Sequence, residues 1–154
     1  MSDAVTRAHV EAFYEAYVSR DPARIGAFLD DDVEWYVAGP AEVMRVCGHW
    51  RGKAAVVDRF ARVVPRVIEF KSLDIEHLLV DGDRSAMFGR VSSVHRATGR
   101  SICHRVAHVA CYRNGKVVSF RVINDSLDAA EQFLGHRISL APEVHPDSDD
   151  LVAV

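Results

Sequence analysis

Hydrophobic residues in the first half of the chain recur at the spacing of amphipathic helices. This spacing predicts one helix over 5–18 and another over 53–64, where Pro65 would end it. Between them, Asp21 followed by proline is typical of a helix N-terminus, so a further helix is expected there. Two short strands are expected beside these helices, over 33–37 and 44–47.

The second half of the chain changes to patterns typical of β-strands. Asp-Gly-Asp, Thr-Gly and Asn-Gly turn signals separate segments at 67–80, 84–97, 100–112 and 116–124. A last helix is predicted over 127–134, ended by Gly135. This order of elements predicts an α+β fold with the helices gathered on one face of the sheet. We expect one domain over 1–135 and a C-terminal tail over 136–154, which is either loose or packed on a neighbour.

Composition narrows the class of protein without naming a function. The 154 residues are 49% hydrophobic and 27% charged, with a net charge of −3, so a nucleic-acid partner is not expected. The N-terminus lacks the apolar core of a secretory signal, and no apolar run is long enough for a membrane span. Three cysteines without C-x-x-C spacing indicate reduced thiols. We therefore expect a soluble, cytoplasmic protein with no membrane partner.

Five stretches in a fixed order carry a family resemblance: FYEAYVSRDPARIGAFLDDDVEWYVAG, GHWRGKAAVVDRF, HLLVDGDRSAMF, TGR and NGKVVSFRVINDSLDAAEQFLG. Together they resemble the NTF2-like superfamily, and within it the SnoaL-like (polyketide-cyclase-like) and ketosteroid-isomerase-like proteins. The resemblance implies a cone, in which a curved antiparallel or mixed sheet wraps around N-terminal helices and encloses a pocket. It also implies a homodimer. The superfamily includes isomerases, cyclases, hydrolases and non-catalytic binding modules, so the activity stays open.

The Asn-Gly and Thr-Gly turns, taken as two-residue hairpin loops, predict a register for the last three strands. One face of the sheet would carry two polar rows, Ser93–His104–Asp125 and Gly89–His108–Arg121. The other face would carry Phe88, Ala107, Val109, Cys111, Val118, Phe120 and Val122. The polar face either lines the pocket or meets water or a dimer partner. A single β-bulge would exchange the two faces of a strand.

Asp125, at the end of the last strand, is the first candidate catalytic residue. In SnoaL-like cyclases this strand ends in an aspartate that acts as general acid and base, and Asp125 matches that position. Alternatively, Asp125 caps the following helix. His104 or His108, the other two candidate catalytic residues, would donate a hydrogen bond to a developing oxygen charge. The expected function is binding of a small, largely apolar organic molecule, with cofactor-free isomerase, cyclase or lyase chemistry. A non-catalytic binding or dimeric interaction module is the alternative.

Five further residues are candidates for substrate binding. Trp35 and Trp50 flank the loop expected at the mouth of the cone, where an indole either stacks on a flat ligand or fills the core or interface. Arg121 would anchor an acidic substituent, and Ser93 lies in the polar row. Phe13 occupies the place where ketosteroid isomerases carry a catalytic tyrosine, so steroid isomerisation is not expected.

No metal site is expected from the H-x-x-x-H pattern of His104 and His108. On a strand, these two side chains would be roughly 13 Å apart, too far to share one ion. No other cofactor motif is present in the sequence, so none is expected.

Overall fold

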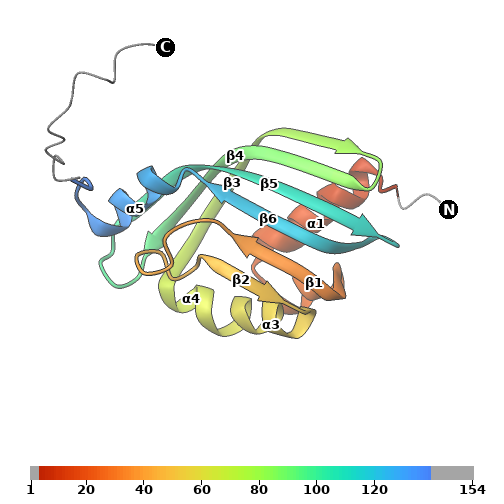
Figure 1. The fold of residues 1–154 in the computed structure, drawn as a ribbon, viewed down its shortest axis with the longest axis horizontal. Coiled ribbons are helices and arrows are strands. Elements are labelled where there is room, and N and C mark those ends of the chain that lie inside the picture. Colours follow the sequence, from red (N-terminus) through yellow and green to blue (C-terminus); the bar gives the residue numbers. More distant parts are fainter. Residues whose placement is uncertain (1–3, 140–154) are drawn as a thin grey trace, which may run out of the picture.

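The computed structural model describes residues 4–139, and most of the expected tail lies outside this range. The elements follow in the order α1 (Arg7–Ser19), α2 (Pro22–Ala27), β1 (Leu29–Val37), β2 (Gly48–Arg51), α3 (Lys53–Asp58), the π-helix η1 (Arg59–Val63), α4 (Val64–Val67), β3 (Ile68–Asp81), β4 (Arg84–His95), β5 (Ser101–Arg113), β6 (Lys116–Asn124) and α5 (Ser126–Leu134) (Figure 1). The predicted α+β class is confirmed. None of the helices in this part of the chain is long and apolar enough to cross a membrane.

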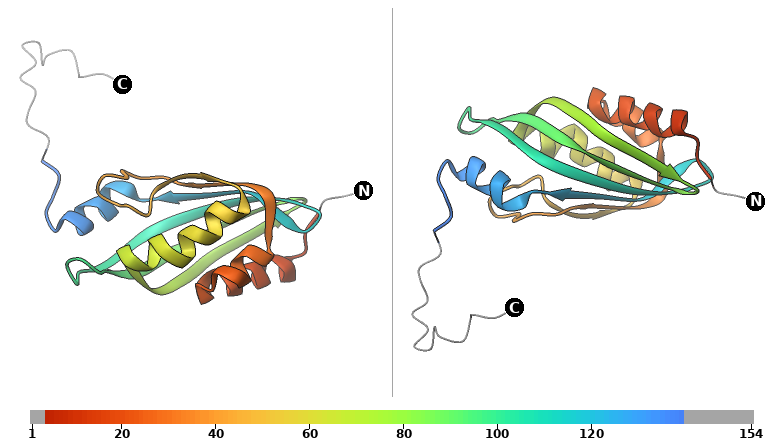
Figure 2. Two further views of the ribbon diagram at one scale, coloured as in Figure 1. Left: turned by 90° about the horizontal axis from the view of Figure 1, so that it is seen from below. Right: turned by 90° about the horizontal axis from the view of Figure 1, so that it is seen from above.

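The strands form one curved sheet in the order β2-β1-β6-β5-β4-β3. β1 runs parallel to β6, whereas the other neighbours are antiparallel. Figure 2 shows α1 and α3 on the same face of this sheet, with α5 beyond the ends of the strands. The space between these helices and the sheet therefore holds the core.

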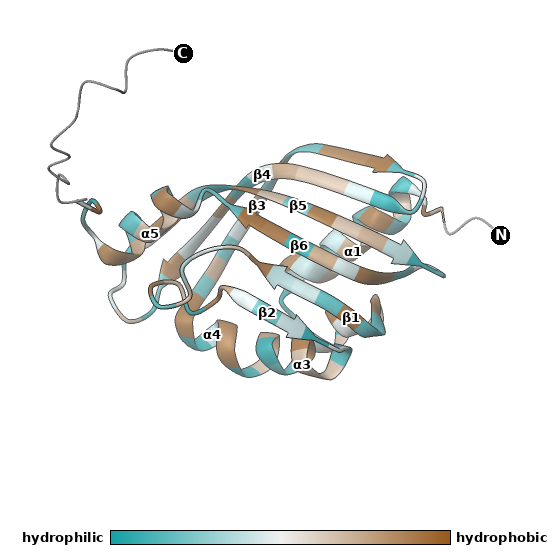
Figure 3. Cartoon of the chain, in the orientation of Figure 1, coloured by the Kyte–Doolittle hydropathy of each residue, from teal (hydrophilic) through white to brown (hydrophobic). Residues whose placement is uncertain are grey.

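Alternation along the strands puts one set of side chains into that core. In β5 the even-numbered residues from Ile102 to Tyr112 are buried, and most of the odd-numbered residues are exposed. Phe13 of α1 packs on Phe120 of β6, with ring centroids 5.4 Å apart, and both are fully buried. Each such side chain stabilises the fold by about 1.5–3 kcal/mol. Hydrophobic and hydrophilic residues also alternate around α3 and α4 (Figure 3).

Local signals located several helix ends correctly. Asp21 caps α2, because its Oδ1 accepts hydrogen bonds from the backbone N–H groups of Ala23 (2.9 Å) and Arg24 (3.2 Å). At the other end of the chain, Gly135 follows α5 with φ of 79°, a left-handed conformation that glycine adopts without steric cost.

Pro65 does not end the third predicted helix, and this expectation is wrong. The chain widens into the π-helix Arg59–Val63 and then continues through Pro65 in α4. Proline is tolerated there because it lies in the first turn of α4, where a backbone N–H has no partner within the helix.

The short strands also differ from the prediction. β1 begins at Leu29 rather than at 33, and the strand expected over 44–47 is a turn in which the Pro40 carbonyl accepts hydrogen bonds from the Val43 and Met44 N–H groups. The strand itself lies at Gly48–Arg51, where it pairs with the end of β1. Pairing with an existing strand, rather than local apolar content, decides its position.

The register between β5 and β6 differs from the prediction by one residue. Tyr112 pairs with Val117 as expected, but a bulge at Val118 makes Cys111 pair with Ser119. His108 therefore lies opposite Val122, so the predicted pairings of His108 with Arg121 and of His104 with Asp125 are wrong. A one-residue shift exchanges the faces of β6: Phe120, Val122 and Asn124 face the core, and Arg121 and Asp125 face away from it.

The register between β4 and β5 differs by two residues. The connecting turn is longer than two residues and is closed by a hydrogen bond from the His95 N–H to the Arg100 carbonyl. Ser93 pairs with Ile102, and His104 pairs with Val91 rather than with Ser93. A two-residue shift keeps each side chain on its predicted face, so Ser93 and His104 still share one.

Candidate functional site

A pocket lies between the concave face of the sheet and the α1 and η1 helices. Its volume is about 90 Å³, several times the roughly 10–15 Å³ that one water molecule needs. Most of the lining is apolar. The polar side chains in the lining are Tyr17, Arg20, Arg59, Ser93, His104, His108 and Asn124. No carboxylate lines this pocket in the part of the chain that the structure describes.

Four of the predicted site residues meet at this pocket. Trp35 comes from β1, Ser93 from β4, and His104 and His108 from β5. Cross-strand pairing explains the arrangement, because Trp35 lies beside Phe120 of β6 and the two histidines point to the same side of β5. The catalytic or binding roles assigned to these residues stay predictions.

The other four predicted residues lie elsewhere. Asp125 and Arg121 are exposed. Asp125 occupies the N-cap position of α5, but its side chain makes no capping hydrogen bond. Phe13 is part of the core and does not line the pocket. Trp50 lies against the Arg59 guanidinium, whose central carbon is 3.3 Å from the centre of the indole.

His104 is held in one orientation by Asn124 of β6, which in turn bonds to the residue that follows β1. Its Nε2 lies 3.0 Å from the Asn124 Oδ1, and the Asn124 Nδ2 donates to the Ala38 carbonyl at 2.7 Å. Because the amide oxygen can only accept, Nε2 carries the hydrogen. The other ring nitrogen, Nδ1, is buried and has no hydrogen-bond partner among residues 4–139. His104, which is 9% exposed, thus has one ring nitrogen that is hydrogen-bonded and one that is not.

His108 lies deeper in the site and is neutral at physiological pH. Burial disfavours its charged form, and the nearby Arg20 charge adds to this, so its pKa falls to about 3. Its Nδ1 shares a hydrogen bond of 3.3 Å with the Tyr14 hydroxyl, and the two rings stack. Burial also raises the pKa of Tyr14, so this pair exchanges no proton near neutral pH.

Two arginines line the pocket, and sequence reasoning missed both. Arg59 is 6% exposed. Burial lowers its pKa to about 10, so it stays charged. Arg20 follows the last residue of α1, and its guanidinium lies over the Phe70 ring at 3.7 Å and the Tyr17 ring at 4.5 Å. Helical spacing could have indicated that Arg59 is buried, because it lies three residues after Val56, on the apolar side of its helix.

Asn124 and Tyr17 were missed as well. Asn124 was passed over for its neighbour Asp125, because the bulge at Val118 has no mark in the local sequence. Tyr17 has the spacing of the apolar stripe of the helix predicted over 5–18. It does lie there, but its ring also contacts His108 and Trp35.

Comparison with known families settles the class of protein. The SnoaL-like domain family matches residues 10–120. The chain belongs to the SnoaL-like family. The expected cone with its curved mixed sheet, typical of NTF2-like proteins, is confirmed by solved structures of the same fold.

Three solved structures similar to this SnoaL-like chain illustrate how widely the fold is used. A proposed isomerase from Rhodopseudomonas palustris is 26% identical, with a TM-score of 0.76 over 86% of this chain and 100% of its own. An NTF2-like protein from Burkholderia thailandensis E264 is 28% identical, with a TM-score of 0.70 over 80% and 93%. TerC, co-crystallised with polyporic acid, shares the fold at 22% identity, with a TM-score of 0.68 over 82% and 95%. No curated protein matches this SnoaL-like chain.

Proposed function

We propose that this SnoaL-like chain binds a small, largely apolar organic molecule in its pocket and exchanges a proton with it without a cofactor. The observation that carries the proposal is a mostly apolar pocket with His104 in its wall. A concave apolar pocket with few polar groups is typical of small-molecule sites.

His104 is the proposed acid–base group. Imidazole is the side chain most often used for proton transfer in enzymes. Asn124 holds the Nε2 hydrogen, which leaves the Nδ1 lone pair without a partner in the described chain. A buried polar atom without a hydrogen bond costs free energy, and a polar group of a ligand would remove that cost. We propose that Nδ1 takes a proton from a carbon next to a carbonyl group and returns it, as in an isomerisation.

Asp125 is not part of this proposal, because its carboxylate is exposed on the opposite side of the strand end from the pocket. His108 is also not the proposed base, because its pKa of about 3 makes it too weak a base at neutral pH. Its neutral ring, hydrogen-bonded to the Tyr14 hydroxyl, forms part of the pocket wall instead.

Binding without turnover is the second candidate function. It is favoured by the absence of any carboxylate from the pocket lining within residues 4–139, since paired acid and base groups are common in proton-transfer sites. A binding module needs only the pocket.

We also propose that the protein forms a homodimer through the outer face of the sheet. Phe88, Ala107 and Ile123 lie side by side across β4, β5 and β6. Phe88 is 37% exposed and Ile123 is 51% exposed, so a hydrophobic row faces away from the core. Analytical ultracentrifugation tests this: Ile123→Lys should give monomers, and an unchanged mass would contradict the proposal.

The binding proposal is tested by native mass spectrometry of the purified protein. Val106 lines the pocket, whereas Val109 lies on the outer face of the same strand. Val106→Phe should fill the pocket and abolish a co-purified small molecule, and Val109→Phe should retain it. If Val106→Phe retains the same molecule, the ligand binds elsewhere.

Proton transfer is tested with the recovered molecule in D₂O, where NMR follows exchange of its C–H positions. The wild type should catalyse this exchange and His104→Gln should not. His49→Gln is the matched control, because His49 is exposed and paired with Glu34. No exchange by the wild type would favour binding without turnover, and exchange by His104→Gln would remove His104 as the base.

A further inference from the structure

The charge of the pocket wall is unbalanced. Arg20 and Arg59 both line the cavity, and no aspartate or glutamate does so in residues 4–139. Neither arginine makes an ion pair with any residue in this range. Buried charges in proteins are normally paired, so two buried or half-buried cations at one cavity require an explanation.

Arg59 is held in place without being neutralised. Its guanidinium lies 3.3 Å from the centre of the Trp50 ring, and one Nη donates to the Arg45 carbonyl at 3.2 Å. A guanidinium has five N–H groups, and these contacts use one of them. The ring face and the carbonyl orient the planar fork but leave most of its donors free.

Arg20 is held in a similar way by aromatic rings. Phe70 and Tyr17 lie within 4.5 Å of its guanidinium carbon, and Phe60 lies at 5.7 Å. Its Nε is buried and has no hydrogen-bond partner in the described part of the chain. Aromatic faces stabilise a cation only modestly, so this site still lacks an acceptor.

We infer that the ligand of this pocket is an organic anion with an aromatic or otherwise flat body, whose oxyanion is bound by Arg59 and Arg20. The inference rests on the proposed binding function and adds the class of ligand. The rings of Tyr17, Trp35 and Phe60 line the same cavity and suit a flat body. The oxyanion is a carboxylate or an ionised, acidic enol, because both present the delocalised oxygens that a guanidinium fork binds.

Matched compounds separate the charge from the shape of the ligand. Naphthalene-2-carboxylic acid is paired with naphthalene-2-carboxamide, and 4-hydroxycoumarin, an acidic enol, is paired with the neutral 4-methoxycoumarin. Isothermal titration calorimetry at neutral pH should show at least one acid binding about tenfold or more tightly than its neutral partner. The two pairs distinguish a carboxylate site from an enolate site.

Variants assign the preference to the pocket arginines. Arg59→Met and Arg20→Met keep much of the side-chain length without the charge, and each should reduce the preference for the acid by about tenfold. Arg24→Met is the control, because Arg24 is exposed on α2 and does not line the pocket. Circular dichroism checks that each variant folds. If one arginine variant does not fold, the inference is judged from the other variant and from the affinities of the wild type for each acid and its neutral partner.

The outcomes separate this inference from the proposed function. If a neutral compound binds as tightly as its acid, the anion inference is overturned, while small-molecule binding stands. If none of the four compounds binds, the co-purified molecule decides: an organic acid supports the inference and a neutral molecule overturns it. If nothing binds and nothing co-purifies, both the inference and the proposed function are overturned.

Discussion

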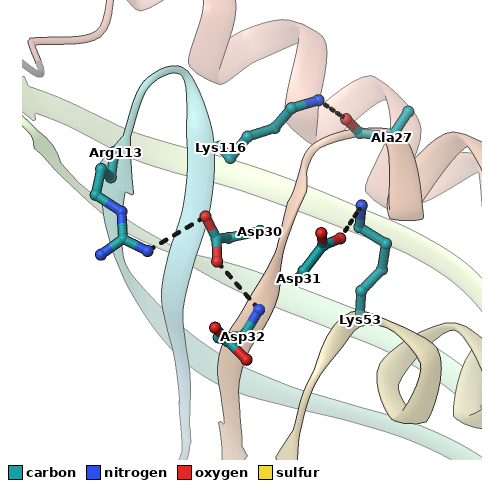
Figure 4. A network of polar contacts seen from close by, with 7 residues as sticks. All are labelled: Ala27, Asp30, Asp31, Asp32, Lys53, Arg113 and Lys116. Atoms are coloured by element: carbon teal, nitrogen blue, oxygen red, sulfur yellow. Dashed lines mark hydrogen bonds and ion pairs between the residues drawn. The ribbon is translucent and has the colours of Figure 1, made fainter.

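Cations in two regions of this protein differ in their partners: those in one region pair with carboxylates, and those in the other lie on aromatic rings. At the start of β1, Arg113 pairs with Asp30 at 3.3 Å and Lys53 pairs with Asp31 at 2.8 Å, as Figure 4 shows. In the pocket, Arg20 and Arg59 lie on aromatic rings and pair with no carboxylate of the described chain. Lys53 and Arg113 are thus paired within the protein, whereas the two pocket arginines have no carboxylate partner among residues 4–139.

One carboxylate of the first region, that of Asp30, is stabilised in its charged form. The Asp32 N–H donates to the Asp30 Oδ1 at 3.0 Å, and this hydrogen bond, followed by Arg113, lowers the pKa of Asp30. Exposed pairs of this kind are typically worth less than 1 kcal/mol, because water screens them. In the pocket, burial lowers the pKa values of His108 and Arg59 instead, since there desolvation opposes charge.

Adding a lysine to each kind of environment should give the largest effect. Val122 faces the pocket that already holds two unpaired arginines, whereas Val18 is exposed on α1. Val122→Lys should lower the free energy of unfolding by about 3 kcal/mol or more, because it buries a further cation without a partner. Val18→Lys should change it by less than about 0.5 kcal/mol. Urea unfolding at neutral pH measures both, and equal stability of the two variants would contradict the contrast.

The pH dependence of stability should give the next largest effect. The pKa of His108 is about 3 when folded and lies near 6.5 when unfolded. The unfolded state therefore binds more protons between these values, and the stability contributed by neutral His108 is lost as the pH falls. The loss is roughly 1.4 kcal/mol per pH unit between about pH 6 and pH 4.

The His108→Gln variant isolates this contribution. Its free energy of unfolding should fall less steeply than that of the wild type over the same pH range, as measured by urea unfolding at several pH values. Asp30→Asn should leave the slope between pH 6 and about pH 5 nearly unchanged, because the contribution of Asp30 is lost only as the pH falls from its unfolded-state pKa near 3.8 toward the lower folded value. Parallel slopes for the wild type and His108→Gln would show that the pKa of His108 is not lowered by folding.

Removing a surface cation should have a small effect on stability. Arg113→Gln and Lys53→Gln each lose one exposed ion pair, so each should lower the free energy of unfolding by about 0.2–1 kcal/mol. Chemical denaturation in low salt and in about 1 M salt measures this, and the difference from the wild type should shrink in high salt. A difference that persists in high salt would mean that packing, not charge, is lost.

Asp125→Asn should have the smallest effect. The carboxylate is exposed and makes no capping hydrogen bond, so stability should change by less than about 0.5 kcal/mol. Retention of a co-purified molecule, followed by native mass spectrometry, should also be unchanged. Loss of the molecule in this variant would indicate that Asp125 takes part in ligand binding.

Several features could be predicted because their cause is local. The Asp21 cap, the Asn-Gly hairpin that pairs Arg113 with Lys116, and the glycine after α5 each depend on residues close together in the chain. Alternation along β5 placed His104 and His108 on one face for the same reason. The helical course through Pro65 was not predicted, because nothing in the local sequence marks the π-helix that precedes it.

The sequence by itself determined the family, the order of elements and the side of β5 on which its histidines lie. Only the tertiary structure decided which face of β6 joins them, because one extra residue at Val118 exchanges Asp125 for Asn124. It also decided that two arginines from separate helical segments line the same cavity. Side-chain alternation is a property of each strand alone, whereas register and cavity walls depend on contacts between segments distant in sequence.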